Sequence, residues 1–346
     1  MTKPAVLIVG AGATGLPVGY HLSLGDADVT FLVRPGRKAA FEAPQRLYCY
    51  DDASLKTFDG YDIVEDVSEL AGRRFEFVLV TLDGHASLSE AGTDMLRALG
   101  DAIRPSDATV IMCAFGMGVR EHYLETMGIP EIRLLHGFLG MLSHQAGAGL
   151  PVHPPTDPAK VAQAAICYRH PKSRKGFRVE TGNPAAAKRF AALYERSGVS
   201  KCARFSKDMS SIFSTIAFPV YVAFELEGWA DIATVTRNKR LWRLACQAQK
   251  EILTLPQHGW RGKALSLVIG PRVNKMVHVK SERDMLPMDS PAFERFHHGG
   301  KVRAQGVESM YRSLDEGRRQ GRPMNALRAL LELLEAHEQA ARTVVG

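Results

Sequence analysis

The apolar positions of the first 200 residues fall into short runs that alternate with amphipathic stretches. Five runs predict strands, at residues 4–9, 28–33, 75–82, 108–115 and 132–138. They are almost uninterrupted by polar residues, as in parallel strands that are covered on both faces. Residues 15–24, 85–99 and 184–197 have the spacing of helices, and Gly198 follows the last of them. This alternation predicts an α/β fold with a parallel sheet.

The pattern changes near residue 206, where strand-like runs give way to helical spacing. Residues 206–229, 236–255, 306–320 and 324–343 predict helices, and Ser206 is a suitable N-cap for the first. The stretch 140–158 holds three glycines and four prolines and therefore predicts a loop. We predict an α/β domain over residues 1–203 and an all-α domain over residues 204–346.

Composition fits two ordinary domains. The 346 residues are 45% hydrophobic, which is enough to fill two cores. The apolar run 216–226 is interrupted by Pro219 and Glu225 and falls short of the roughly 20 residues that span a bilayer. No secretory signal precedes the first strand, so we expect a cytoplasmic protein without a membrane segment. The five cysteines never form a CxxC pair, which predicts reduced thiols.

Charge and histidine content argue against two other classes of protein. The net charge of +7 is dispersed and no nucleic-acid-binding motif occurs, so we expect no nucleic-acid partner. The twelve histidines show no metal-ligand spacing, and we expect no metal. The pair His297-His298 lies in a glycine-containing stretch that predicts a loop. The apolar C-terminal helices suit either a single core or a homodimer.

A glycine-rich turn joins the first predicted strand to the first helix. Gly10, Gly12 and Gly15 form a G-x-G-x-x-G pattern in VLIVGAGATGLPVGYHL. The first glycine allows a tight turn, the second lets the backbone approach a pyrophosphate, and the third lets helix and strand pack closely. The helix N-terminus adds free N–H groups and a positive dipole end. This predicts a Rossmann-type dinucleotide site formed by Gly10, Ala11, Gly12, Ala13, Thr14 and Gly15.

The residue after the second strand indicates which dinucleotide is bound. An NAD enzyme would place Asp or Glu there, on the ribose hydroxyls. This chain has Arg34 instead, followed by Arg37 and Lys38. A guanidinium can hold a 2′-phosphate through two charge-assisted hydrogen bonds, whereas a carboxylate would repel it. The pattern therefore favours NADPH.

A polar stripe marks the start of the second domain. Lys207, Ser211 and Thr215 follow one another at intervals of four and share one helix face. Reduction of a ketone requires a proton and a positive charge at the oxygen, and a lysine can supply both. The alternative is an exposed lysine near a helix N-terminus.

With these features the chain resembles the ketopantoate reductase family, two-domain NADPH enzymes with a Rossmann half and a helical half. The resemblance runs over nearly the whole length, through GAGATG, VTFLVRPGR, FEFVLVTLDGHA, CAFGMG, SKDMSS, DMLPMD and GRPMNALRALLELL. It implies that Lys207 is the proton donor. It also implies that Leu82, Phe115 and Gly116 border the cofactor.

The resemblance includes several departures from the family pattern. Asp83 stands where the family has a lysine, and Phe115 replaces the asparagine of an Asn-Gly pair. Substrate-shell asparagines correspond to Ser211 and Thr215, and a substrate-binding serine corresponds to Asp284. The family glutamate aligns closest to Gln305, with Glu308 one turn later as its substitute. The implied catalytic residues are Lys207 and Glu308, and the implied substrate residues are Ser211, Thr215 and Asp284.

These observations predict an NADPH-dependent oxidoreductase that reduces the carbonyl of a small 2-oxo acid or similar ketone, with an acceptor that can differ from ketopantoate. Two alternatives stay open. An opine-type enzyme would first condense an amine with the ketone. A protein that has lost catalysis would bind NADPH as a sensor or for a partner.

Overall fold

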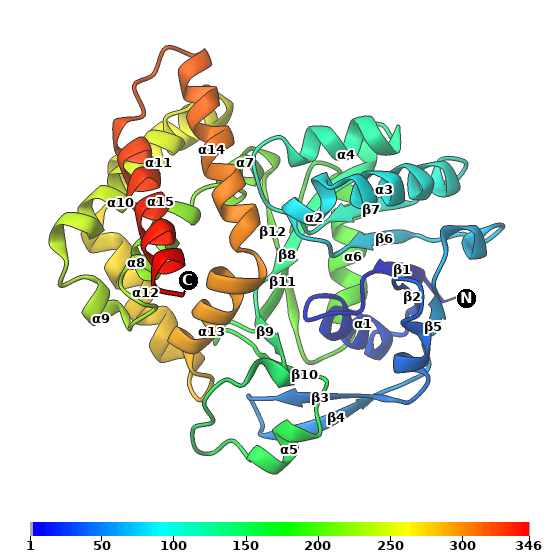
Figure 1. Cartoon of the computed structure of the whole chain (residues 1–346). Coiled ribbons are helices and arrows are strands. Elements are labelled where there is room, and N and C mark those ends of the chain that lie inside the picture. The colour runs from blue at the N-terminus through cyan, green and yellow to red at the C-terminus, as the bar shows by residue number, and fades with distance from the viewer. Residues whose placement is uncertain (1–2, 346) are drawn as a thin grey trace. The chain divides into compact units, whose positions relative to one another are not determined.

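The computed structural model describes residues 3–345, with side chains through residue 343, and divides into two compact units (Figure 1). The first, here called the α/β unit, comprises Met1–Ala114 and Gly118–Lys207. The second, here called the helical unit, comprises Phe115–Met117 and Asp208–Gly346. Residues 115–117 thus belong with the helical unit although they directly follow a strand of the α/β unit.

The α/β unit contains an eight-stranded sheet in the order β12-β11-β8-β7-β6-β1-β2-β5. All neighbouring pairs are parallel except β11 with β8, so the sheet is mixed rather than fully parallel. The five predicted strands are present but shorter than predicted. The strands are β1 (Ala5–Val9), β2 (Asp28–Leu32), β5 (Asp62–Val64), β6 (Phe77–Val80), β7 (Thr109–Met112), β8 (Leu134–Leu139), β11 (Lys175–Glu180) and β12 (Lys201–Phe205).

Helices cover both faces of this sheet, which explains why its strands are so apolar. Val6 and Ile8 belong to the core beneath α1 and α6, whereas Leu7 and Val9 belong to the core beneath α3 and α4. The alternation follows from the period of two along a strand. The helices of the α/β unit are α1 (Gly15–Leu24), α2 (Gly84–Leu88), α3 (Glu90–Ile103), α4 (Val119–Met127), α6 (Pro184–Glu195) and α5 (Pro158–Ala162), of which α5 contacts β4 (Ser54–Phe58), a strand outside this sheet.

The segment 85–99, predicted as one helix, contains the end of α2 and the beginning of α3. Ser89 has an extended backbone with φ −66° and ψ 162°. Its hydroxyl accepts a hydrogen bond from Gly92 N at 3.1 Å and so caps α3. The break therefore has a local cause, because serine is a favoured N-cap residue.

A second sheet of four strands lies in the α/β unit, in the order β4-β3-β10-β9. Its strands are β3 (Gln45–Cys49), β4 (Ser54–Phe58), β9 (Leu142–Gln145) and β10 (Ile166–Arg169). The prediction of a loop over residues 140–158 is therefore wrong at its start, where β9 pairs antiparallel with β10.

The helical unit is built from helices, as predicted. They are α7 (Ser210–Phe213), α8 (Phe218–Leu226), α9 (Ile232–Val235), α10 (Lys239–Leu253), α11 (Gly259–Val268), α12 (Pro271–Met285), α13 (Ser290–Phe296), α14 (Arg303–Arg319) and α15 (Asn325–Val345). The long helix α10 packs against α8 and α15, with Trp242 and Leu327 in the shared core. The predicted fold class, a Rossmann-type domain followed by an all-α domain, is confirmed.

Two local predictions in the helical unit need correction. The expected helix over residues 206–229 is interrupted by turns at residues 214–217, before Pro219 enters the first turn of α8. The expected loop at His297-His298 is a π-helix, His297–Lys301, that continues α13. A Cβ on Gly299 would lie 2.7 Å from the Trp229 ring, so this helix is packed closely and is not a free loop.

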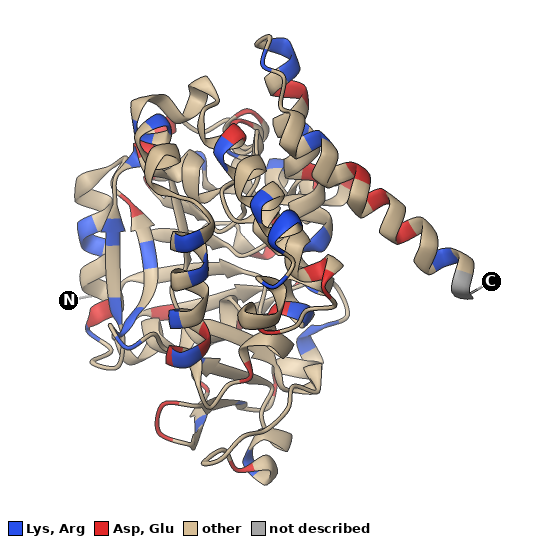
Figure 2. Ribbon diagram, turned by 90° about the vertical axis from the view of Figure 1, so that its left-hand side faces the viewer, with Lys and Arg blue, Asp and Glu red and all other residues tan. Residues whose placement is uncertain are grey.

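Residues 207–226 are long and apolar enough to cross a membrane by length and composition alone, and the mean hydropathy of their most apolar 18-residue window is 1.4. However, 56% of the most apolar window is buried inside the protein, and turns interrupt the segment. This is typical of a core helix. Basic and acidic residues are interspersed over the elements, as Figure 2 shows, in agreement with the dispersed charge expected from the sequence.

Candidate dinucleotide site and catalytic residues

The glycine loop leaves the carboxyl end of β1, which pairs with β2 on one side and β6 on the other. The chain passes from β1 through α1 to β2 and reaches β6 later, so the strand order reverses at β1. Ligands of open α/β sheets bind at such reversal points, outside the carboxyl ends of the strands.

The three glycines differ in what the surrounding protein allows. Gly10 has φ +96°, and a Cβ there would lie 2.7 Å from Thr81 Oγ1. A Cβ on Gly15 would lie 1.9 Å from the carbonyl oxygen of Gly10. A Cβ on Gly12 would meet no protein atom within 4 Å. Packing of the chain therefore requires glycine at positions 10 and 15 but not at 12, which fits the close approach of a pyrophosphate to the backbone at Gly12.

The N-terminus of α1 fits an anion. No side chain caps it, although Thr14 occupies the capping position. Uncapped amides of a first helical turn carry the positive end of the helix dipole, and phosphate binds there. Ala13 is buried in the core and Ala11 packs partly against it, so these two residues hold the loop in place.

The end of β6 supports the same turn. The Thr81 hydroxyl donates to Val9 O at 2.7 Å. Leu82 is half-buried and packs against the adjacent core. The Asp83 carboxylate accepts a hydrogen bond from Ala86 N at 2.8 Å and caps α2. Asp83 thus has a structural role at the position where the resemblance would place a lysine.

Arg34 lies in an exposed turn after β2. Arg37 N donates to Arg34 O at 3.1 Å, with Pro35 and Gly36 between them and Gly36 at φ +77°. This is the residue pattern of a type II turn. Because β2 is the immediate neighbour of β1, the turn that holds Arg34 follows the strand on which the ribose of a dinucleotide is recognised.

Phe115 and Gly116 follow β7 but are held by the helical unit. Phe115 N donates to Gln305 Oε1 at 3.3 Å, and Met117 N donates to Ser309 Oγ at 3.3 Å. Gly116 has φ +130°, a conformation that favours glycine. Two side chains of α14 therefore fix the backbone of this short loop.

Lys207 ends the α/β unit and is 47% exposed. Its ammonium donates to Glu131 Oε1 at 2.5 Å. This hydrogen bond is the main cause that holds the pKa of Glu131 below its ordinary value. Arg120 lies 3.6 Å from the same carboxylate oxygen. Sequence reasoning missed Glu131, because 76 residues separate it from the lysine.

Ser211 and Thr215 converge on a histidine that sequence reasoning also missed. His258 Nδ1 lies 3.1 Å from Ser211 Oγ, and His258 Nε2 lies 3.4 Å from Thr215 Oγ1. His258 is only 3% exposed, and burial lowers its pKa to about 4. Its hydroxyl partners lie 47 and 43 residues away, so no local pattern could have indicated it.

The two predicted acidic residues of the helical unit each contact a cation of their own helix. Glu308 Oε1 accepts a hydrogen bond from Arg312 Nη2 at 2.8 Å. Asp284 is buried and pairs with Lys280, and Arg283 lies 3.4 Å away. Both carboxylates are thus held in place by neighbouring cations.

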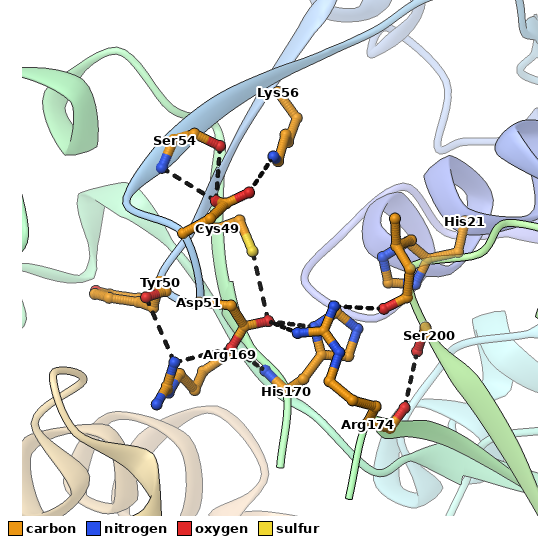
Figure 3. Close-up of polar contacts among 12 residues, drawn as sticks. His21, Cys49, Tyr50, Asp51, Ser54, Lys56, Arg169, His170, Arg174 and Ser200 are labelled. Carbon is orange, nitrogen blue, oxygen red and sulfur yellow. Dashed lines mark hydrogen bonds and ion pairs between the residues drawn. The ribbon is translucent and has the colours of Figure 1, made fainter. Parts of the chain in front are cut away.

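A separate polar cluster surrounds Asp51 in the α/β unit (Figure 3). The Asp51 carboxylate accepts hydrogen bonds from Arg169 at 2.9 Å, from His170 Nδ1 at 2.6 Å and from Arg174 at 2.9 Å. Cys49, Asp51 and His170 are close enough together to bind a metal ion. However, two guanidinium groups already neutralise Asp51, and burial raises the pKa of the Cys49 thiol to about 11. These charges favour an ion-pair network over a metal cation.

The fold of this chain has counterparts among solved structures. A 2-dehydropantoate 2-reductase from Geobacter metallireducens matches 96% of this chain and 99% of its own at 16% identity and a TM-score of 0.66. One from Methylococcus capsulatus matches 97% of each chain at 16% identity and a TM-score of 0.67. A D-mandelate dehydrogenase in complex with NADH matches 97% and 99% at 15% identity and a TM-score of 0.64.

By sequence alone, no protein-family model and no curated protein matches the chain. The likeness therefore lies in the fold, a Rossmann-type α/β unit followed by a helical unit. In that fold the chain is similar over its whole length to 2-dehydropantoate 2-reductases and to D-mandelate dehydrogenase.

Proposed function

We propose that this protein is a divergent ketopantoate-reductase-like oxidoreductase that uses NADPH to reduce the carbonyl of a small 2-oxo acid or related ketone. The observation that carries the proposal is the glycine loop, which packs tightly at Gly10 and Gly15 and leaves Gly12 open. Likeness in fold over the full length to reductases and a dehydrogenase of this kind supports it.

The cofactor is held by the backbone of residues 10–15, with Leu82, Phe115 and Gly116 at the nicotinamide end. Arg34 supports the choice of NADPH, because an exposed guanidinium after β2 suits a 2′-phosphate. The D-mandelate dehydrogenase structure contains NADH, so the preference for NADPH rests on this arginine.

Lys207 is the proton donor of the reaction. When bound, the reduced nicotinamide supplies a hydride to the carbonyl carbon. The Lys207 ammonium gives its proton to the carbonyl oxygen and regains one from solvent. Glu131 is the natural partner of this lysine, because its carboxylate stays ionised and accepts a hydrogen bond from the ammonium. In the helical unit, Ser211, Thr215 and Asp284 orient the substrate, and Glu308 assists as the second catalytic group.

The ion pair of Lys207 with Glu131 also favours a second candidate function, an NADPH-binding protein without catalysis. A lysine that keeps this partner in the loaded protein would not reach a substrate. Such a protein would bind NADPH tightly but would not oxidise it, whichever acceptor is offered.

A substrate screen separates these functions. Purified protein is mixed with NADPH and a panel of 2-oxo acids and β-keto compounds, each with and without added amino acids, and loss of the reduced-nicotinamide absorbance is followed. We expect substrate-dependent oxidation without an amine. Oxidation only with an amine would indicate the opine-type reaction, and tight NADPH binding without oxidation would indicate the non-catalytic protein.

A further inference from the structure

The contact of His258 with the hydroxyl groups of Ser211 and Thr215 determines which of the two hydroxyls donates a hydrogen bond and which accepts one. A neutral imidazole carries one N–H donor and one acceptor nitrogen, so its two hydroxyl partners must play opposite roles. Which hydroxyl donates can be worked out from their other contacts.

The hydrogen bonds of Thr215 show whether Nε2 of His258 carries a proton. Its hydroxyl lies 3.1 Å from the carbonyl oxygen of Ser211, and a carbonyl can only accept. The single proton of Thr215 is therefore used on that carbonyl. Toward His258, Thr215 can only accept, so the proton of the imidazole is on Nε2.

The role of the Ser211 hydroxyl follows from the protonation of the imidazole. Because burial lowers the pKa of His258 to about 4, the ring is neutral at physiological pH and Nδ1 has no proton. Nδ1 must accept, and Ser211 Oγ–H is the donor at 3.1 Å. The other acceptor near this hydroxyl, Gln257 O, is at 3.5 Å, the outer limit for a hydrogen bond.

We propose that His258 is a positioning residue that turns the Ser211 hydroxyl inward, so that Ser211 offers only lone pairs to a ligand. The contact of Ser211 with Gln257 is exposed to solvent, so the serine oxygen lies where a ligand can reach it. This position then selects a substrate that carries a hydroxyl or amine donor and disfavours a carboxylate. The asparagine that the resemblance places here could both donate and accept. The inferred substrate preference rests on the proposed function. The inferred direction of the Ser211 hydrogen bond does not.

Nitrogen NMR of the full chain, labelled with 15N at histidine, tests this polarity directly. We expect a protonated Nε2 and an unprotonated, hydrogen-bonded Nδ1 for His258 between pH 6 and 8. Ser211→Ala should shift the Nδ1 signal and leave Nε2 protonated, and loss of the signals in His258→Asn assigns them. A proton on Nδ1, or an imidazolium, would overturn the proposal whether or not the protein is an enzyme.

Kinetics with ketone pairs that differ by one hydroxyl test the consequence for substrates. Suitable pairs are pyruvate with 3-hydroxypyruvate and 2-oxobutyrate with 2-oxo-4-hydroxybutyrate. A single hydrogen bond predicts a KM about three- to tenfold lower for the hydroxylated member. Equal KM values, or a preference that survives Ser211→Ala, would contradict the selection.

Two further variants show whether His258 acts through Ser211. His258→Leu should abolish the preference, and adding it to Ser211→Ala should change nothing more. His258→Asn should keep most of the preference, because its amide oxygen can accept the Ser211 proton. If no ketone lowers the absorbance of NADPH, the proposed function is refuted. The NMR result would still decide whether the Ser211 hydroxyl donates to His258. Circular dichroism melting identifies a variant that has failed to fold.

Discussion

The proposed preference for NADPH over NADH rests on one side chain, Arg34. It is exposed, and its only proposed partner is the 2′-phosphate that NADH lacks. Hydrogen bonds to charged groups contribute about 1.5–3 kcal/mol, and exposure to solvent reduces the contribution of this one to about 1–2 kcal/mol. We expect Arg34→Ala to raise the Kd for NADPH about five- to thirtyfold and to leave the Kd for NADH unchanged. A parallel loss for both nucleotides, measured by calorimetry, would assign the arginine a structural role.

Lys207 is expected to act in catalysis and not in cofactor binding. General acid catalysis contributes about 10²–10⁴-fold, so Lys207→Ala should lower kcat at least about 100-fold while the Kd for NADPH stays within about twofold. Lys201→Ala removes another exposed lysine of the same unit and is the matched control. Steady-state rates and nucleotide titrations of the two variants are compared. Retained turnover in Lys207→Ala would exclude this lysine as the proton donor.

In the turn from β1 into α1, the effects of alanine at Gly15 and at Gly12 on stability can be compared. In Gly15→Ala the new Cβ would lie 1.9 Å from a backbone carbonyl that cannot move without distorting the turn. We expect a loss of about 2–3 kcal/mol in the free energy of unfolding. Gly12→Ala meets no protein atom within 4 Å and should change stability by no more than about 0.5 kcal/mol.

The same pair should behave differently toward the nucleotide. The methyl group of Gly12→Ala lies on the face that the pyrophosphate approaches, so its Kd for NADPH should rise at least about tenfold in a folded protein. Urea unfolding and calorimetry of both variants give the two measurements. If Gly12→Ala bound NADPH as tightly as the wild type, the loop would not hold the pyrophosphate.

Elements defined by local patterns could be predicted from the sequence, and elements defined by distant partners could not. β1, the glycine loop and α1 follow one another along the chain, and α1 was predicted at its observed bounds. The small sheet was missed because its inner strand β3 pairs with β10, which lies more than 100 residues away. β9 was missed for a different reason: it lies in a stretch whose glycines and prolines predict a loop, although its partner β10 is close in the sequence.

The residues of the candidate site also fall into two groups, those that a local sequence pattern indicates and those that it does not. The glycine loop and Arg34 could be proposed from the sequence, because the chemistry expected of them depends on neighbours in the sequence. Glu131 and His258 could not, because the groups they contact lie 43 to 76 residues away. Conversely, the role of Asp83 as the cap of α2 explains a residue that the sequence showed only as a departure from the family pattern.

For the whole molecule, four buried or half-buried histidines predict how stability depends on pH. Burial lowers the pKa of His136 to about 3 and of His258, His278 and His297 to about 4. In the unfolded chain these rings titrate near 6.5, so between pH 6.5 and 4 the unfolded state binds protons that the folded state does not. Stability is therefore complete above pH 6.5 and falls as the pH decreases, with about two to four protons taken up on unfolding near pH 5.

A buried carboxyl opposes this trend without reversing it. Burial raises the pKa of Glu294 to about 8, so its contribution to stability grows as the pH falls from 8 toward its unfolded value. One such group does not outweigh four histidines. Urea unfolding at pH 7, 6 and 5 should give a decreasing free energy of unfolding. A value that is constant or higher at pH 5 would contradict the burial of these rings in the folded protein.

The proposed enzyme requires a nicotinamide nucleotide bound at the carboxyl end of β1. Calorimetric titration of the purified wild-type chain with NADPH, and separately with NADH, tests this most directly. We predict saturable one-to-one binding of NADPH with a Kd at least about five times lower than that for NADH, the lower bound set by the charge-assisted bonds of Arg34. No heat of binding for either nucleotide would contradict the assignment of the glycine loop and, with it, the proposed enzyme.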